Sequence, residues 1–389
     1  MKKWIFLLLS AGLLWYLLMP QWQSLDKMAE RRFKALNLQG HELLVGVSWP
    51  SAINQDGMAD GLQLAMEEIN AGHLTGGPPI RLVFRDPGFD RAKNQKIALE
   101  FADTPDMSAV LGYYEDSAAI TASVLFESSR LLHLMLAANS NAMTQRGYKY
   151  IARTVLCNGL IGEALAKKSV ALGYKNFALI WEENAFGIDL AYQYHVAMDG
   201  LAKDLLYQVS YPLDRADFRL CVNELKEVDA DVIFFAGLEP QAGDFIRTAR
   251  ALGLKTPILG AFSDTPEMRR RAGPALEGAM FFDFYDVHSP TPENQAFVRA
   301  FQARFHRLPD AMAAQGYDAL YILAKGARFT NSRNPLDLSY AIRFMDPWEG
   351  ANGRYQFDGH GELKDKPIHI KVYKNGVPET LGVGAGTPP

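Results

Sequence analysis

From residue 42 onward, short apolar runs alternate with longer stretches in which apolar residues recur every three or four positions. Residues 43–48 form an apolar run of strand length. Residues 58–69 then carry apolar side chains at helical spacing, and the sequence Asn70-Ala71-Gly72 ends that helix. This alternation predicts βα units arranged around a mainly parallel sheet.

The same pattern continues along most of the chain. Further strands are predicted at residues 80–84, 109–111, 132–136, 177–181, 231–236, 258–260 and 279–282. Further helices are predicted at residues 91–102, 117–129, 161–172, 188–201, 218–228, 243–252, 293–306 and 311–329. The strands form two groups separated near Cys157, which predicts an α/β fold with two doubly wound parallel-sheet lobes.

The first 23 residues differ from the rest of the chain. Lys2 and Lys3 precede sixteen almost wholly apolar residues, from Trp4 to Met19, which is typical of an export signal. The following residues, PQWQ, are not the small residues that signal peptidase requires, and no lipobox cysteine is present. We therefore expect an uncleaved signal anchor (a transmembrane helix) over residues 1–23, holding the protein at the inner membrane, and a helical stalk over residues 24–41.

Composition and charge exclude several classes of protein. The 389 residues are 48% hydrophobic and 22% charged, which is enough apolar material for two or three cores and excludes disorder. A net charge of -4 provides no positive field for nucleic acid. The two cysteines, Cys157 and Cys221, have neither CxxC spacing nor a histidine at metal spacing. Whether they pair stays open, because an oxidising compartment would permit a disulfide.

The common catalytic motifs are absent from the sequence, which has no phosphate loop, no GxGxxG after a strand, no HExxH and no GxSxG. The closest approach to a metal-ligand cluster is DGHGE at residues 358–362, in a predicted turn where a polar hairpin is the favoured interpretation. We therefore expect no catalytic residues, no metal and no cofactor.

Several segments resemble the leucine/isoleucine/valine-binding protein family of type I periplasmic solute-binding proteins, which serve ABC transporters. The most specific is QRGYKYIART at residues 145–154, similar to the family's segment before the first crossing between lobes. Others agree in order and spacing: EEIN ending at Asn70, VLG at residues 110–112, AFG at residues 185–187 and GLEPQAGDFIRTARALGLKTPILG at residues 237–260. Together the resemblance extends over residues 43–375.

The resemblance implies two lobes joined by a three-segment hinge, with crossings near residues 154–158, 281–285 and 345–352. Lobe 1 would comprise residues 42–156 plus 284–346, and lobe 2 residues 157–283 plus 347–381, with a flexible tail at 382–389. It also implies that a small-molecule ligand is bound at the carboxyl ends of the parallel strands and held there by hinge closure.

When the ligand-binding positions of the family are carried over to this sequence, the resemblance implies ligand contacts from both lobes. In lobe 1 they fall on Asp116 and its neighbour Ser117, on Ala137, Ala138 and Asn139, and near Met312. In lobe 2 they fall on Phe186, Leu238 and Phe262. Trp49, after the first strand, is a further candidate for stacking on ligand. If the alignment slips by one residue, Glu239 takes the acidic role that otherwise falls on Phe262.

Two of these positions depart from the family pattern. The resemblance implies a small hydroxyl residue at Asp116, facing the ligand carboxylate, and an acid at Phe262, facing the ligand ammonium. Like charges about 4 Å apart repel by ~1 to 4 kcal/mol, so Asp116 disfavours a ligand carboxylate. We therefore expect a neutral or cationic ligand, of the amino-acid-like, amide or amine class, with a donor group directed at Asp116 or Asn139.

Alternative interpretations of these residues remain open. Asp116 could serve only as the N-cap of its helix, and Asn139 only as a turn former. Leu238 and Phe262 could belong to the core of lobe 2, and Trp49 could pack at the edge of its lobe.

The predicted function is extracytoplasmic capture of a small solute for an ABC importer, whose permease would be the protein partner. The alternative is a membrane-tethered sensory or regulatory module of the same fold that signals through a membrane partner. A scaffold without ligand and an enzyme are the weaker hypotheses.

Overall fold

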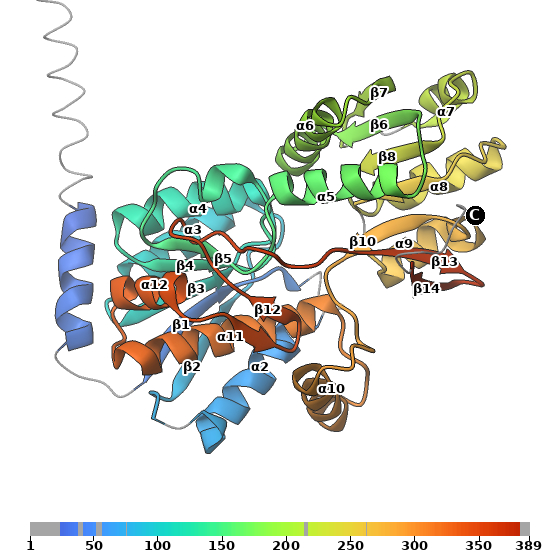
Figure 1. Cartoon of the computed structure of the whole chain (residues 1–389). Helices are drawn as coiled ribbons and strands as arrows, with labels where there is room; N and C mark the ends of the chain where they lie inside the picture. The colour runs from blue at the N-terminus through green and yellow to red at the C-terminus, as the bar shows by residue number, and fades with distance from the viewer. Residues whose placement is uncertain are drawn as a thin grey trace, which may run out of the picture.

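The computed structural model describes residues 24–37, 42–51, 57–74, 76–213, 217–261 and 263–381. They form two α/β lobes that lie side by side and are joined by extended segments (Figure 1). The predicted anchor at residues 1–23, the tail at residues 382–389 and Phe262 lie outside the described residues. Within the described ranges, no helix combines the length and the apolar character needed to cross a membrane.

Lobe 1 contains a five-stranded parallel sheet in the order β2-β1-β3-β4-β5. Its strands β1, β3 and β4 are buried at every residue, as their continuous apolar sequences require in a sheet covered on both faces. The strands are β1 (Leu43–Ser48), β2 (Ile80–Arg85), β3 (Met107–Gly112), β4 (Leu132–Met135) and β5 (Ile151–Arg153).

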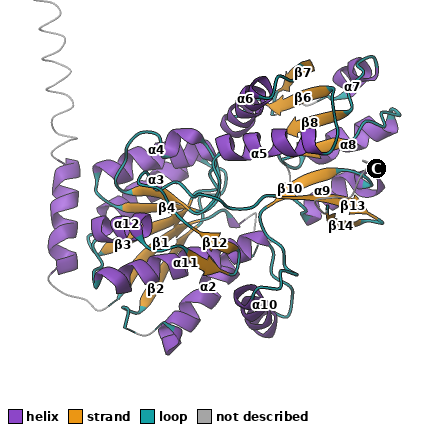
Figure 2. Cartoon of the chain, viewed as in Figure 1, coloured by secondary structure: helices purple, strands orange, loops and turns teal. Residues whose placement is uncertain are grey.

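Helices cover both faces of this sheet (Figure 2). Helices α2 (Met58–Glu68), α11 (Ala311–Thr330) and α12 (Pro335–Phe344) pack with Leu43, Val45 and Val47 of β1. Helices α3 (Arg91–Asp103) and α4 (Asp116–Ser128) pack on the opposite face, which includes Leu44. Helix α10 (Pro292–Phe305) joins α2 and α11 in a separate cluster at the edge of the lobe.

Lobe 2 contains a seven-stranded sheet in the order β14-β13-β10-β9-β8-β6-β7. The strands β6 (Phe177–Glu182), β7 (Leu205–Tyr211), β8 (Val232–Ala236), β9 (Ile258–Gly260) and β10 (Met280–Asp283) are parallel. The strands β13 (His369–Lys374) and β14 (Val377–Thr380) add an antiparallel hairpin at one edge. One face is covered by α5 (Asn158–Ala171) and α6 (Ala185–Gly200), the other by α7 (Arg219–Lys226), α8 (Gln241–Ala251) and α9 (Pro266–Ala272).

Three segments connect the lobes. Strand β5 leads through residues 154–157 into α5, and β10 leads through residues 284–291 into α10. The third connection follows β11 (Trp348–Gly350) and β12 (Gly353–Tyr355), and enters lobe 2 at β13. Residues 347–357, which the sequence division placed in lobe 2, pack with lobe 1 because Trp348 stacks on Tyr321 and Tyr355. The third crossing therefore lies later than the expected residues 345–352.

The helix at residues 24–37 is docked on lobe 1 (Figure 1). Arg32 is only 1% exposed, and its guanidinium donates hydrogen bonds to the carbonyls of Ala102 and Ser129, both at 2.5 Å. These carbonyls lie at the C-terminal ends of α3 and α4, where helix carbonyls lack partners and favour a cation. Arg333 also donates to the carbonyl of Leu36 at 2.8 Å. The expected stalk is thus a helix packed on lobe 1.

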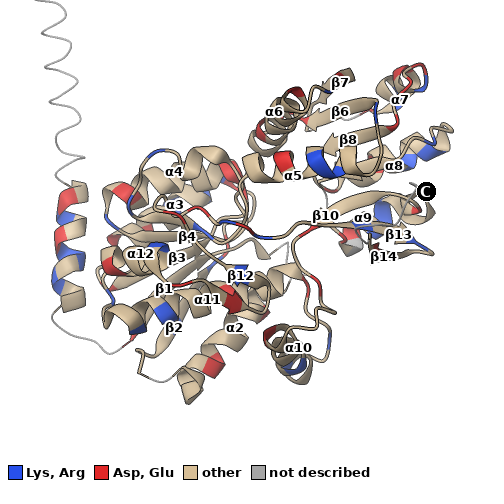
Figure 3. Cartoon of the chain, viewed as in Figure 1, with Lys and Arg blue, Asp and Glu red and all other residues tan. Residues whose placement is uncertain are grey.

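Charges are dispersed over the molecule. Figure 3 shows basic and acidic residues interspersed over both lobes and on the helix at residues 24–37. Cys157, at the first crossing, and Cys221, on α7, are both free thiols.

Candidate functional site

The carboxyl ends of both parallel sheets lie at the connections between the lobes, because β5 and β10 leave their lobes there and reach the other lobe within a few residues. The loops that follow the strands are in direct contact. Asp189, on α6 of lobe 2, accepts a hydrogen bond from the backbone N–H of Asn141 in lobe 1 at 3.1 Å. Its Oδ2 also accepts from the side-chain amide of Asn158 at 2.9 Å. The strand-end loops are therefore the parts of the two lobes that face each other.

Asp116 lies in the first turn of α4 and is 5% exposed. Its Oδ1 accepts hydrogen bonds from the backbone N–H groups of Asn139 at 2.8 Å and Ser140 at 3.1 Å, in the loop after β4. Its Oδ2 is buried and has no hydrogen-bond partner. The N-cap residue of α4 is Glu115, whose side chain makes no capping bond. Asp116 therefore joins two strand-end loops instead of capping its helix.

Burial raises the pKa of Asp116 to about 6. The backbone N–H groups of Ser140 and Asn139 and the charge of Arg153 oppose this rise, and the charge of Asp189 adds to it. The carboxyl group thus lies in a place that disfavours its ionised form unless a further cation is supplied.

The neighbouring loop after β4 supports the first crossing. Asn139 donates from its side-chain amide to the carbonyl of Leu156 at 2.6 Å, and its own carbonyl accepts from the N–H of Asn158 at 2.8 Å. The amide of Asn139 is therefore used within the first connection between the lobes, Ala138 is buried, and Ala137 packs on the core of lobe 1.

Arg153, at the end of β5, is fully buried. It donates to the carbonyl of Ser140 at 2.8 Å and to Oγ1 of Thr144 at 3.0 Å. Its Nε lies 3.2 Å from Oε2 of Glu362, so the charge of this arginine is balanced by a carboxylate of the third connecting segment. Arg153 and Glu362 join the first and third connections between the lobes.

The DGHGE segment forms the expected polar hairpin. Oδ1 of Asp358 accepts from the N–H groups of His360 at 2.8 Å and Glu362 at 2.9 Å, and Phe357 and Leu363 form an antiparallel bridge. No group of three or more His, Cys, Asp or Glu residues suited to a metal ion occurs in the part of the chain that the structure describes.

Lobe 2 presents two carboxylates at the ends of adjacent strands. Glu182, the last residue of β6, is 2% exposed, and its Oε2 accepts a long hydrogen bond of 3.4 Å from the N–H of Leu238. Glu239 follows β8, and its Oε2 is buried without a hydrogen-bond partner. Burial raises the pKa of both carboxyl groups, and the charge of Glu182 adds to the rise at Glu239.

Tyr211 ends the neighbouring strand β7, and its buried hydroxyl also has no partner. A Cβ atom at Gly237 would lie 2.0 Å from this hydroxyl oxygen, so the side chain of Tyr211 occupies the space that a side chain at position 237 would need.

The remaining predicted contacts are more dispersed. Trp49 is buried and packs edge-on against Tyr114 at 5.6 Å. Met312 packs on the core of lobe 1 and Phe186 on that of lobe 2, whereas Ser117 is exposed. The structure thus brings Asp116 together with Asn139 in lobe 1, and Leu238 and Glu239 together with Glu182 in lobe 2.

Sequence reasoning missed Glu182, Asp189, Arg153 and Tyr211. A usable signal existed for Glu182, which directly follows the predicted strand at residues 177–181 and is the first charged residue after it. Charged residues at the carboxyl ends of parallel strands are candidates for ligand contact.

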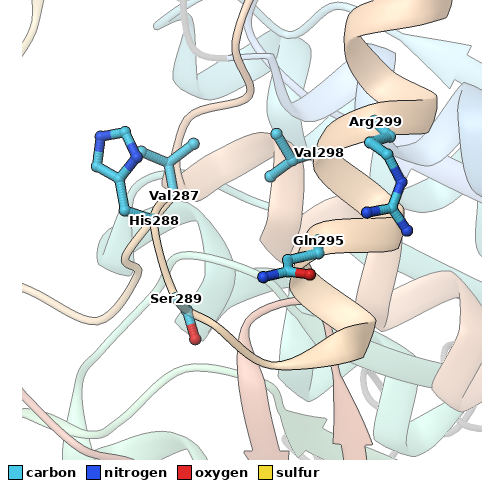
Figure 4. Close-up of a pocket in the computed structure, with 6 residues that line it drawn as sticks. All are labelled: Val287, His288, Ser289, Gln295, Val298 and Arg299. Atoms are coloured by element: carbon cyan, nitrogen blue, oxygen red, sulfur yellow. The ribbon is translucent and has the colours of Figure 1, made fainter.

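A surface pocket of ≈ 250 Å³ lies elsewhere, between α10 and the segment before it (Figure 4). It is lined by Val287, His288, Ser289, Gln295, Val298 and Arg299. None of these is a predicted contact, and we do not assign the ligand to this pocket.

Comparison with known proteins gives one family. The sequence model of the family described as periplasmic binding protein matches residues 43–370. The leucine-, isoleucine-, valine-, threonine-, and alanine-binding protein of Pseudomonas aeruginosa is 24% identical over 322 residues, covering 82% of this chain and 85% of its own. The Leu/Ile/Val-binding protein homolog 1 of Brucella suis is 26% identical over 332 residues, covering 83% of this chain and 88% of its own.

Solved structures have the same fold. An ABC transporter substrate-binding protein from Desulfitobacterium hafniense, in complex with Leu, superposes with a TM-score of 0.79 at 27% identity, covering 87% of this chain and all (100%) of its own. A leucine binding protein from Thermotoga maritima has a TM-score of 0.79 at 22% identity, covering 87% and 98% of the two chains, and supports the fold alone.

Proposed function

Because the chain belongs to the periplasmic binding protein family, we propose that it captures a small solute between its two lobes and delivers it to an ABC importer. The family implies a location outside the cytoplasm. The relatives and structural neighbours are substrate-binding proteins, so the chain is a binding protein and not an enzyme.

The observation that carries the proposal is the meeting of the strand-end loops at the hinge. Asp116 and Glu239 each place a buried carboxylate oxygen without a partner in these loops, one in each lobe. A polar group buried without a partner costs roughly 1–3 kcal/mol, and a ligand that supplies the missing donor regains that free energy. A solute that touches both lobes would favour a closed arrangement over an open one.

The proposed ligand belongs to the amino-acid-like, amide or amine class. The names of the relatives from Pseudomonas and Brucella, and the leucine complex of the Desulfitobacterium protein, support a solute of amino-acid size. Leu238 and Phe186, both half-buried at the strand-end edge of lobe 2, are proposed to contact its apolar part.

Anchoring at the inner membrane is proposed from the sequence of residues 1–23, in which two lysines precede sixteen apolar residues. Membranes washed with alkaline carbonate should retain the protein. Its release into the supernatant would refute an uncleaved anchor. A sensory role finds no support among the relatives.

A thermal-shift screen of the full-length chain in detergent tests the function. The panel should contain amino acids, amides, amines and ureas. A ligand present at about one hundred times its dissociation constant should add about 2.7 kcal/mol of stability. Small-angle scattering should then show a smaller radius of gyration with that ligand. If no solute stabilises the protein, or if the stabilising solute leaves the radius unchanged, capture by closure is refuted.

A further inference from the structure

The strand-end loops at the hinge are rich in carboxylates that lack a cation. Asp116 and Asp189 accept hydrogen bonds from consecutive residues of the loop after β4, and the charge of Asp189 raises the pKa of Asp116. Glu182 ends β6, and Glu239 follows the adjacent strand β8. In the part of the chain that the structure describes, none of these four carboxylates lies within ion-pair distance of Lys or Arg, and the nearby Arg153 is paired with Glu362.

In lobe 1, two of the donors that could hold an anion are already used. The backbone N–H groups of Asn139 and Ser140 both donate to Oδ1 of Asp116. A carboxylate of the ligand would have to displace Asp116 from these N–H groups and would then lie beside its negative charge. Both effects disfavour a ligand with a carboxylate on this side.

In lobe 2, the unsatisfied groups are hydrogen-bond acceptors. Oε2 of Glu239 has no partner, and Glu182 accepts a long bond of 3.4 Å from the N–H of Leu238 and a second bond from the side chain of Asn184. Ammonium and guanidinium groups have several donors and carry the charge that these carboxylates lack.

We propose that the solute is a small cationic amine or guanidine without a carboxylate, whose cationic group binds Glu182 and Glu239 and whose other polar donor reaches Oδ2 of Asp116. This inference rests on the proposed function, because it assigns the ligand of the same site. The proposed ligand differs from the amino acids that the names of the relatives specify. The inference follows from the side chains of this chain alone.

Matched pairs of solutes test the proposal. Isothermal titration calorimetry of the full-length chain should compare leucine with 3-methylbutylamine, lysine with cadaverine, and arginine with agmatine, since each amine is the amino acid without its carboxylate. The best-fitting amine should bind at least about tenfold more tightly than its amino acid, as expected for a charge-assisted contact. An amino acid that binds more tightly than its amine would overturn the inference and leave the proposed function intact. If none of the six binds, the inference fails, and the wider thermal-shift screen decides the proposed function separately.

Variants identify the residues. Glu239→Gln should weaken binding of the amine by about tenfold or more, whereas Glu227→Gln, an exposed acid at the end of α7 in the same lobe, is the matched control. Amine affinity that is unchanged in Glu239→Gln would overturn the assignment.

Substitutions of Asp116 separate its two effects. Asp116→Asn keeps an oxygen for the N–H groups of Asn139 and Ser140 and removes the charge, so it should weaken amine binding without creating a carboxylate site. Asp116→Ser frees both N–H groups and should raise the affinity for the amino acid of the pair by about tenfold. Circular dichroism confirms that each variant is folded. If Asp116→Ser is folded and gains no affinity for the amino acid, the role assigned to Asp116 is wrong.

Discussion

His133 should make the protein sensitive to acid. It lies in β4, fully buried between Tyr113 and Phe126, with ring centroids 5.2 Å away on each side. Both ring nitrogens are buried. Burial lowers the pKa of His133 from 6.5 to about 3, and the backbone of Gly112 opposes the shift only in part. In the unfolded chain the ring regains its ordinary pKa.

The sign of the effect follows from proton binding. Between the unfolded pKa of 6.5 and the folded pKa of about 3, the unfolded chain binds a proton at this ring and the folded chain does not. The free energy of unfolding is therefore at its full value above the pKa of His133 in the unfolded chain. It falls as the pH is lowered toward the pKa of His133 in the folded protein. Near pH 5 the loss is RT ln(1 + 10^1.5), or about 2 kcal/mol.

The variant His133→Leu has nearly the same volume and continues the apolar sequence of β4, so it should remove this loss. Urea unfolding followed by circular dichroism should be measured for both proteins near pH 7 and near pH 5. The stability of the variant relative to wild type should rise by about 2 kcal/mol between these conditions, whatever its value near pH 7. His288→Gln, at an exposed histidine, is the control. A relative stability of His133→Leu that is the same at both pH values would refute the argument.

Three further predictions concern stability. Arg32→Met should lower the free energy of unfolding by about 2–4 kcal/mol, because the carbonyls at the ends of α3 and α4 lose a charged donor, and an undiminished urea midpoint would contradict this. The free energy of unfolding of the wild type should fall by up to about 3 kcal/mol as the pH rises from about 4 past about 6, because Asp116 ionises, and that of Asp116→Asn should not. Parallel pH profiles of unfolding for the two proteins would exclude this. Gly237→Ala should lower the free energy of unfolding by about 1–3 kcal/mol in the wild type, because the new methyl group meets the hydroxyl of Tyr211. The loss should be smaller in Tyr211→Phe, which lacks that hydroxyl. Equal losses in the two backgrounds would argue against the clash.

Much of the fold could be predicted from the periodicity of apolar residues. The buried strands β1, β3, β6 and β8 are mostly apolar, and their apolar runs predict them because a strand covered on both faces has few polar positions. The edge strand β7 was missed because exposed and half-buried residues alternate along it.

The hairpin of β13 and β14 was also missed, although a signal was present. The sequence Asn375-Gly376 lies between the two strands, and both residues have positive φ values of 52° and 77°. Such a pair between two β-rich runs is a strong sign of a tight hairpin turn.

The site was less predictable than the fold. Position along the chain placed Asp116 and Glu239 at strand ends, but the partner of Asp116 is a loop 23 residues later, which no local pattern specifies. The same holds for Arg153 and Glu362, which are separated by more than two hundred residues and meet only because the third connection returns past the first. Sequence reasoning locates such groups on the fold, whereas their pairing depends on how the connections cross.

The docked helix at residues 24–37 determines which lobe moves in the proposed closure. Arg32 ties it to α3 and α4, and Arg333 ties its end to the start of α12, so all of these contacts are within lobe 1. A rotation about the three connections leaves these hydrogen bonds intact, because none of them crosses the hinge. The contacts that must adapt are those between the lobes, such as the bonds that Asn141 forms with Asp189 and with Gly159. Whatever is attached to the N-terminal helix is therefore fixed relative to lobe 1, and in the proposed closure lobe 2, with Glu182 and Glu239, would be the part that moves toward the solute.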